Sequence, residues 1–204
     1  MADSSPTPTA DILSQVLAEY DSRISIDGSS KLLVSNAEIA SQIADFTAPI
    51  RTPYGPSLTI ATRGDSNPKL PEGVNCTAEP LDSLTSKMDF FTHAVFGVGG
   101  EDPKFVMEGL KWMHYALRPK GVAIVIALEQ GSEEVEEGKF VVGLTDKITY
   151  QSKGKARSVE DLVELAGFER GKVRSFEVTS EREFGGKKAV AKVVLARKWD
   201  QLTG

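Results

Sequence analysis

DFFTHAVFGVGGEDPKFVMEGLKWMHYALRPKGVAIVIAL, residues 89–128, is the stretch of sequence that decides the fold. It begins with an apolar run, Thr92 to Val98, which is short enough for a buried strand. Glycines and then Glu101-Asp102-Pro103 follow, a pattern typical of a helix start. The next apolar residues recur at steps of four, three and four, so they share one face of a helix. They are Val106, Leu110, Met113 and Leu117.

The same stretch ends in a second strand. Pro119 disfavours helical backbone at Arg118, so we expect the helix to end there. Gly121 then turns the chain into Val122 to Leu128, an unbroken apolar run rich in β-branched residues. A strand, a helix and a parallel strand form a βαβ unit, and strands that are apolar on both faces belong to a sheet covered on both sides. The stretch therefore predicts an α/β fold.

The composition is that of one ordinary domain. The chain has 204 residues, of which 40% are hydrophobic and 26% are charged. Its formal net charge of −5 argues against a nucleic-acid partner, because such a surface needs a basic field. No apolar segment is long enough to span a membrane. Residues 1–10 are rich in Ser, Thr and Pro and predict a disordered leader before a single domain over residues 11–204. Because the leader lacks the features of a signal peptide, we expect a cytoplasmic protein.

Cysteine and histidine are scarce. Cys76 is the single cysteine, which excludes an internal disulfide and a multi-cysteine zinc site. His93 and His114 are the two histidines, so we expect no metal site.

The remaining elements follow from apolar periodicity and from turn residues. We expect helices over residues 11–20, 31–46 and 158–166. We expect strands over residues 57–62, 74–81, 173–178 and 189–196, the last two forming an antiparallel hairpin around Gly185-Gly186. Residues 129–157 are irregular, and a connection of that length is usually a functional insertion or a lid.

Two turn motifs resemble those of class I S-adenosylmethionine-dependent methyltransferases. Leu117-Arg118-Pro119-Lys120-Gly121 looks like the L-(K/R)-P-x-G turn before the family's fifth strand, and Leu165-Ala166-Gly167-Phe168 looks like its L-x-x-A-G-F turn. Met88-Asp89-Phe90 resembles a displaced and inverted F-D before the fourth strand, and the terminal hairpin is similar to the closing strands. The resemblance covers residues 57–197. It implies a three-layer α/β sandwich with a mostly parallel sheet and an antiparallel C-terminal hairpin, and it says little about chemistry.

The family's cofactor motif is where this sequence departs from the pattern. In the family a loop of roughly D-x-G-x-G-x-G follows the first strand, and its glycines let the backbone approach the methionine part of S-adenosylmethionine. Here no G-x-G occurs before residue 97. The nearest counterpart is Ile26 to Ser30, in which Asp27 and Gly28 would be the remnant of the loop. A surface turn is the alternative.

Two further cofactor contacts of the family have only weak counterparts. Asp65 could match the acid that ends the second strand and binds the ribose hydroxyls, although a turn-forming aspartate explains it equally well. Thr77 stands near the place of the acid that binds the adenine amino group, and a hydroxyl brings no charge. Charge-assisted bonds contribute roughly 1–3 kcal/mol each, and micromolar binding corresponds to about 8 kcal/mol. We therefore expect no cofactor, with S-adenosylmethionine bound only if the loop has diverged beyond this pattern.

The glycine cluster after the fourth strand is the candidate ligand pocket. Open α/β sheets bind their ligands at the carboxyl ends of the strands. The pocket residues would be Phe96, Gly97, Gly99, Gly100 and Glu101. A tight strand-to-helix turn is the alternative. His93, in the same strand, is the candidate catalytic acid or base, and a buried core histidine is its alternative.

Three functions remain open from the sequence. The chain is a repurposed member that binds or transforms a small organic molecule without methyl transfer, or a non-catalytic partner or scaffold acting as a homodimer, or an active methyltransferase with a diverged cofactor loop. The missing glycines favour the first two functions over the third. The lid-like segment 129–157 favours the first over the second.

Overall fold

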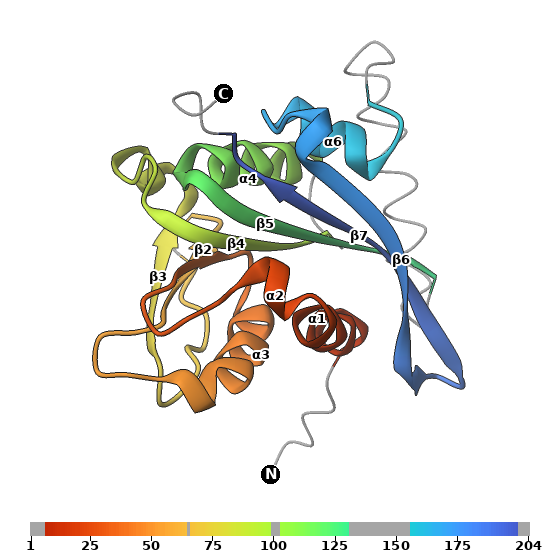
Figure 1. The fold of residues 1–204 in the computed structure, drawn as a ribbon, viewed down its shortest axis with the longest axis horizontal. Helices are drawn as coiled ribbons and strands as arrows, with labels where there is room; N and C mark the ends of the chain where they lie inside the picture. The colour runs from red at the N-terminus through yellow and green to blue at the C-terminus, as the bar shows by residue number, and fades with distance from the viewer. Residues whose placement is uncertain (1–6, 65, 99–102, 131–155, 200–204) are drawn as a thin grey trace.

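The protein is built around one seven-stranded sheet. The computed structural model describes residues 7–64, 66–98, 103–130 and 156–199. The strand order is β3-β2-β1-β4-β5-β7-β6, in which β1 to β5 are parallel and the β6–β7 hairpin is antiparallel (Figure 1). The strands are β1 (Lys31–Val34), β2 (Ser57–Thr62), β3 (Asn75–Pro80), β4 (Phe91–Val98), β5 (Leu117–Gln130), β6 (Val173–Phe184) and β7 (Lys187–Arg197).

Helices cover both faces of the sheet, which makes three layers (Figure 1). One layer holds α1 (Pro8–Glu19), α2 (Asp21–Ile24) and α3 (Ala37–Thr47), and the other holds α4 (Pro103–Ala116) and α6 (Val159–Leu165). Short 3-10 turns lie at η1 (Ala48–Ile50), η2 (Leu81–Ser86) and η3 (Arg170–Lys172). Among the described residues, no helix is both long and apolar enough to cross a membrane. The predicted α/β sandwich with an antiparallel C-terminal hairpin is confirmed.

The central βαβ unit forms as the sequence predicts. All eight residues of β4 are buried, as expected for a strand covered on both sides. Val106, Leu110 and Met113 of α4 are buried against the sheet. The turn that opens β5 needs a glycine, because a Cβ at Gly121 would lie 2.8 Å from the Arg118 carbonyl oxygen. This close backbone approach gives the L-R-P-K-G motif its physical basis.

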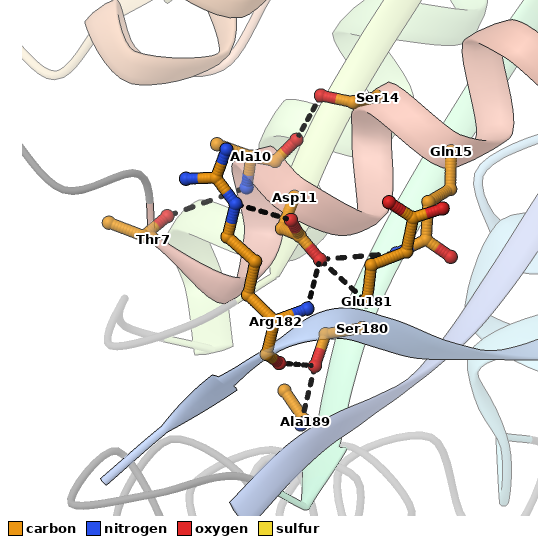
Figure 2. Close-up of polar contacts among 9 residues, drawn as sticks. All are labelled: Thr7, Ala10, Asp11, Ser14, Gln15, Ser180, Glu181, Arg182 and Ala189. Carbon is orange, nitrogen blue, oxygen red and sulfur yellow. Dashed lines mark hydrogen bonds and ion pairs between the residues drawn. The ribbon is translucent and has the colours of Figure 1, made fainter.

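The β6–β7 hairpin holds α1 in place by bonding to the Asp11 carboxylate of that helix (Figure 2). Asp11 Oδ2 accepts a 2.9 Å hydrogen bond from the backbone N–H of Glu181, and Asp11 Oδ1 lies 3.6 Å from Arg182 Nε. The pairing of β6 with β7 shifts register at this point, and Ser180 bridges the shift with bonds to Arg182 O and Ala189 N. The N-terminal half of α1 is thereby fixed against the far edge of the sheet.

The expectation of one helix over residues 31–46 is wrong. Lys31–Val34 is the strand β1, which pairs with β2 on one side and with β4 on the other. A new helix, α3, begins at Ala37 after Asn36 caps it. The three apolar residues of β1 are buried and consecutive, and periodicity alone does not distinguish so short an apolar run from a segment of a buried helix. Pairing with β2 and β4 makes this segment a strand and not a helix.

The N-terminal boundary also differs from the expectation. α1 begins at Pro8, inside the stretch predicted to be a disordered leader, whereas residues 1–6 lie outside the described part. Thr7 caps the helix and Pro8 occupies its first turn, where a proline loses no hydrogen bond. The other predicted elements are confirmed with small shifts, except that β5, β6 and β7 are longer than expected and α4 ends at Ala116, before Leu117. Residues 131–155 of the predicted lid segment lie outside the described residues.

Candidate functional site

The carboxyl ends of the parallel strands form the edge at which α/β proteins of this kind bind ligands. The strand at the centre of this edge, β1, is joined to α3 by two residues, Ser35 and Asn36, and neither is a glycine. Asn36 Oδ1 accepts from the backbone N–H of Ile39 and so caps α3. The Ser35 N–H donates to Val95 O at 3.0 Å, and the Gly97 N–H donates to Ser35 Oγ at 3.0 Å. The Ser35 N–H, the Ser35 hydroxyl and the Asn36 amide oxygen are thus engaged with the protein itself.

The first turn of α1 lies against the same edge. Thr7 Oγ1 donates a hydrogen bond to the carboxylate of Glu38 in α3. A Cβ added at Gly97 would lie 3.0 Å from Ile39 Cδ1, 3.5 Å from Thr9 Cγ2 and 3.9 Å from Asn36 Nδ2. Side chains of α1 and α3 therefore fill the space beside Gly97.

Phe96 and Gly97, from the predicted ligand pocket, face opposite sides of β4. Gly97 faces α1 and α3, and Phe96 packs against α4, where a Cβ at Gly109 would come within 2.5 Å of its ring. The other predicted pocket residues, Gly99, Gly100 and Glu101, lie outside the described residues. That the five predicted pocket residues bind a ligand stays a prediction.

His93 is a core residue with both ring nitrogens bonded. Its side chain is only 5% exposed. Nε2 lies 2.7 Å from Ile24 O, and because a carbonyl can only accept, Nε2 carries a proton. Nδ1 lies 2.7 Å from Thr92 Oγ1. Burial lowers the pKa of His93 below its ordinary value, against the opposing effect of the bond to Ile24. The structure thus buries the predicted acid or base in the amino half of β4, with an oxygen atom within hydrogen-bond distance of each ring nitrogen.

Asp27 and Gly28 precede β1 and do not follow the first strand as the resemblance required. They lie at the amino edge of the sheet, opposite the carboxyl ends of β1 and β4. Asp27 Oδ1 accepts bonds from the N–H and the hydroxyl of Ser29 at 2.8 and 2.7 Å, and these bonds lower the pKa of Asp27. This is a turn in which an aspartate bonds its own backbone. The structure therefore corrects the position assigned to the cofactor loop.

Of Thr77 and Asp65, the structure describes only Thr77. Thr77 lies in the middle of β3, opposite Thr59, with 3.4 Å between the two hydroxyl oxygens. The strand continues for three residues beyond Thr77 to Pro80, so Thr77 is not at the carboxyl edge. Asp65 follows Thr62, the last residue of β2, by three positions in the sequence and lies outside the described residues. The structure does not bring Asp27, Gly28 and Thr77 together into one site.

Sequence reasoning missed Ser35 and Asn36, the residues that stand directly after β1. A signal was present, because asparagine is a preferred helix cap and Ala37 begins a good helix-forming run. In the described part of the chain, no group of three or more His, Cys, Asp or Glu residues could hold a metal ion.

Comparison with solved structures places this architecture among known folds. A provisionally assigned methyltransferase from Bacillus halodurans matches with a TM-score of 0.53 at 12% identity, over 91% of this chain and 100% of its own. A Methanosarcina mazei S-adenosylmethionine-dependent methyltransferase matches with a TM-score of 0.51 at 16% identity, over 90% and 97% of the two chains. The Burkholderia thailandensis 1,6-didemethyltoxoflavin-N1-methyltransferase, solved with S-adenosylhomocysteine, matches with a TM-score of 0.54 at 16% identity, over 95% and 80%.

The chain has a class I methyltransferase-like fold. The identities are too low to carry more than the fold. No family model and no curated protein matches the sequence.

In a methyltransferase-like fold, the connection after β1 is the place of the glycine-rich cofactor loop. Here Ser35 and Asn36 occupy that place, and α3 begins directly after them. Glycines that would let the backbone approach a methionine moiety are absent from residues 29–54. The space beside Gly97 is filled by Ile39 and Thr9. These residues do not fit S-adenosylmethionine in the manner of the family's loop.

Proposed function

We propose that this methyltransferase-fold protein binds or transforms a small organic molecule without transferring a methyl group from S-adenosylmethionine. The observation that carries the proposal is the two-residue connection between β1 and α3. The Ser35 N–H, the Ser35 hydroxyl and the Asn36 amide oxygen are bonded within the protein, and Thr9 of α1 lies beside Gly97 of the neighbouring strand. A ligand at this place would have to displace those contacts before it gained any of its own.

The free energy of the family's cofactor contacts that this chain lacks is comparable with the affinity that a cofactor needs. Micromolar binding corresponds to about 8 kcal/mol. Each charge-assisted hydrogen bond contributes roughly 1–3 kcal/mol, so the loss of two or three such contacts removes about 2–9 kcal/mol of that affinity. Opening the packed space beside Gly97 adds a further cost. In this proposal the chain keeps the methyltransferase-like fold but does not transfer methyl groups.

An active methyltransferase is the main alternative, and the shared fold supports it. The Burkholderia thailandensis relative holds S-adenosylhomocysteine. A scaffold that acts as a homodimer, and a cytoplasmic location, remain predictions from the sequence.

A thermal-shift titration tests the proposal. A ligand present at 100 times its Kd stabilises the folded state by about 2.7 kcal/mol, and each 1 kcal/mol raises the Tm of a 150–250-residue domain by about 2–4 °C. With S-adenosylmethionine or S-adenosylhomocysteine at about 1 mM we expect a Tm change of less than about 1 °C. A rise of about 5–10 °C, as expected for a Kd of about 10 µM, would establish the alternative. The Burkholderia thailandensis enzyme is the positive control.

A further inference from the structure

A cavity of about 390 Å³ lies at the opposite edge of the sheet from the β1–α3 connection. It is bounded by the α1–α2 junction, by η3, by β5, by the start of β6 and by the end of β7. Three buried aliphatic residues, Ile24, Val122 and Leu195, form its floor. Tyr20 and Phe176 line it as a stacked pair, with ring centroids 4.6 Å apart and an interplanar angle of 22°. The volume falls within the range of about 300–1,000 Å³ that is usual for small-molecule sites.

Four cationic side chains also line this cavity: Arg23, Lys172, Arg174 and Arg197. All four residues are exposed, so their charges stand at the mouth above an apolar floor. Arg197 is oriented by a 2.7 Å hydrogen bond from its guanidinium to Arg23 O. The Arg23 guanidinium lies 5.8 Å from the centre of the Tyr20 ring.

We call these four residues the cationic rim. None of them has a carboxylate partner among the residues that the structure describes. Other cations in the described part do have one, as in the pairs of Lys87 with Glu79 and of Lys198 with Asp89. The rim is therefore a local concentration of positive charge in a chain whose formal net charge is −5. Like charges repel one another, and an anion bound among them would relieve that repulsion.

We propose that this cavity binds a small organic anion with a flat, apolar body, such as an aromatic carboxylate, sulfonate or phosphate ester. The stacked rings and the aliphatic floor suit the body of such a molecule, and arginine guanidinium groups match the planar oxygen pair of the anion. The inference rests on the proposed function and names its ligand class and its site. Since the cavity and the β1–α3 connection lie at opposite edges of the sheet, the two can be tested separately.

Fluorescence titration with a matched pair of probes tests the proposal on the full chain. The anionic probe is 8-anilinonaphthalene-1-sulfonate, and the neutral probe is N-phenyl-1-naphthylamine, which has the same rings without the sulfonate. We expect one site for the anionic probe. Arg174→Gln and Arg23→Gln should each weaken the anionic probe by about 10-fold or more, because each removes a charge-assisted contact. Both should change the Kd of the neutral probe by less than about 2-fold.

Two further variants separate this site from other surfaces. Arg157→Gln removes an exposed arginine beside α6, on the other face of the sheet, and should leave both probes unchanged. Gly171→Trp should weaken both probes, because Gly171 lines the cavity and a Cβ there meets no atom within 4 Å, so the variant can fold. Far-UV circular dichroism and Tm confirm folding.

The proposal is overturned if Arg174→Gln and Arg23→Gln bind the anionic probe as tightly as the wild type does, or if Gly171→Trp has no effect. These outcomes leave the proposed function standing. A large Tm rise with S-adenosylmethionine would instead refute the proposed function and leave the cavity result intact.

Discussion

Replacement of His93 by Leu and by Ala tests whether this residue stabilises the fold. The Nε2–H of His93 is bonded to Ile24 O, and the residue is 5% exposed. His93→Leu keeps most of the side-chain volume but removes this donor, so a buried carbonyl loses its partner at a cost of about 1–3 kcal/mol. His93→Ala also leaves a cavity, and together the two effects should cost about 2–4 kcal/mol.

Urea denaturation followed by circular dichroism measures these losses. The m-value should be unchanged, because the surface exposed on unfolding is nearly the same. The two variants should unfold at lower urea concentrations, His93→Ala at the lowest. If either variant is as stable as the wild type, the bond to Ile24 contributes nothing and the structural account of His93 is refuted.

The pH dependence of stability gives a second test of the same residue. Burial lowers the pKa values of both His93 and His114 in the folded state, and the unfolded state keeps the ordinary value of 6.5. Below pH 6.5 the unfolded state therefore binds more protons, so the free energy of unfolding falls as the pH falls toward the folded pKa values. Above pH 6.5 these two groups add no pH dependence. His93→Leu should show a shallower loss between pH 6.5 and 5 than the wild type does, and an equally steep loss would contradict the assignment.

Substitutions at three other positions, with Gly171→Ala as a control, test the packing that positions the site. Asp11→Ala removes the bond to the Glu181 N–H and should lower the free energy of unfolding by about 1–2 kcal/mol, whereas Arg182→Gln should cost less than about 0.5 kcal/mol because that side chain is 64% exposed. Equal losses would mean that the ion pair, and not the backbone bond, holds α1. Gly109→Ala places a Cβ within 2.5 Å of the Phe96 ring and should cost about 1–3 kcal/mol. Gly171→Ala, in open space, is its control, and thermal denaturation measures both.

The second half of the fold could be predicted from sequence because its signals are local. Pro119 ends a helix and Gly121 permits a close backbone approach, so the L-R-P-K-G turn is specified by the residues within it. Gly185 and Gly186 both have positive φ angles, of 56° and 78°, and turn the hairpin in the way that their sequence indicates. The resemblance to methyltransferases rested on these local features, and the fold confirms it.

The first half could not be predicted in the same way because β1 is defined by its neighbours. Leu32, Leu33 and Val34 form a strand only because β2 and β4 pair with them from both sides. Without that strand, the sequence predicts the remnant of the cofactor loop at Asp27 and Gly28, which lie at the amino edge of the sheet. Because the sequence predicts β1 as part of a helix, the predicted cofactor loop falls before β1 and not after it.

The cavity at the opposite edge also has no sequence signature. Its lining comes from Tyr20 and from α2, β5, η3, β6 and β7, and the cations at its mouth are spread from Arg23 to Arg197. Only the folded chain brings them together.

Isothermal titration calorimetry with S-adenosylhomocysteine is the most direct test of the claim that the β1–α3 connection does not admit the cofactor. Titration of about 50 µM protein, a concentration that reveals micromolar affinities, should give heats no larger than those of dilution. A one-site isotherm with a Kd of about 10 µM or lower would contradict the account and identify the protein as a cofactor-binding methyltransferase.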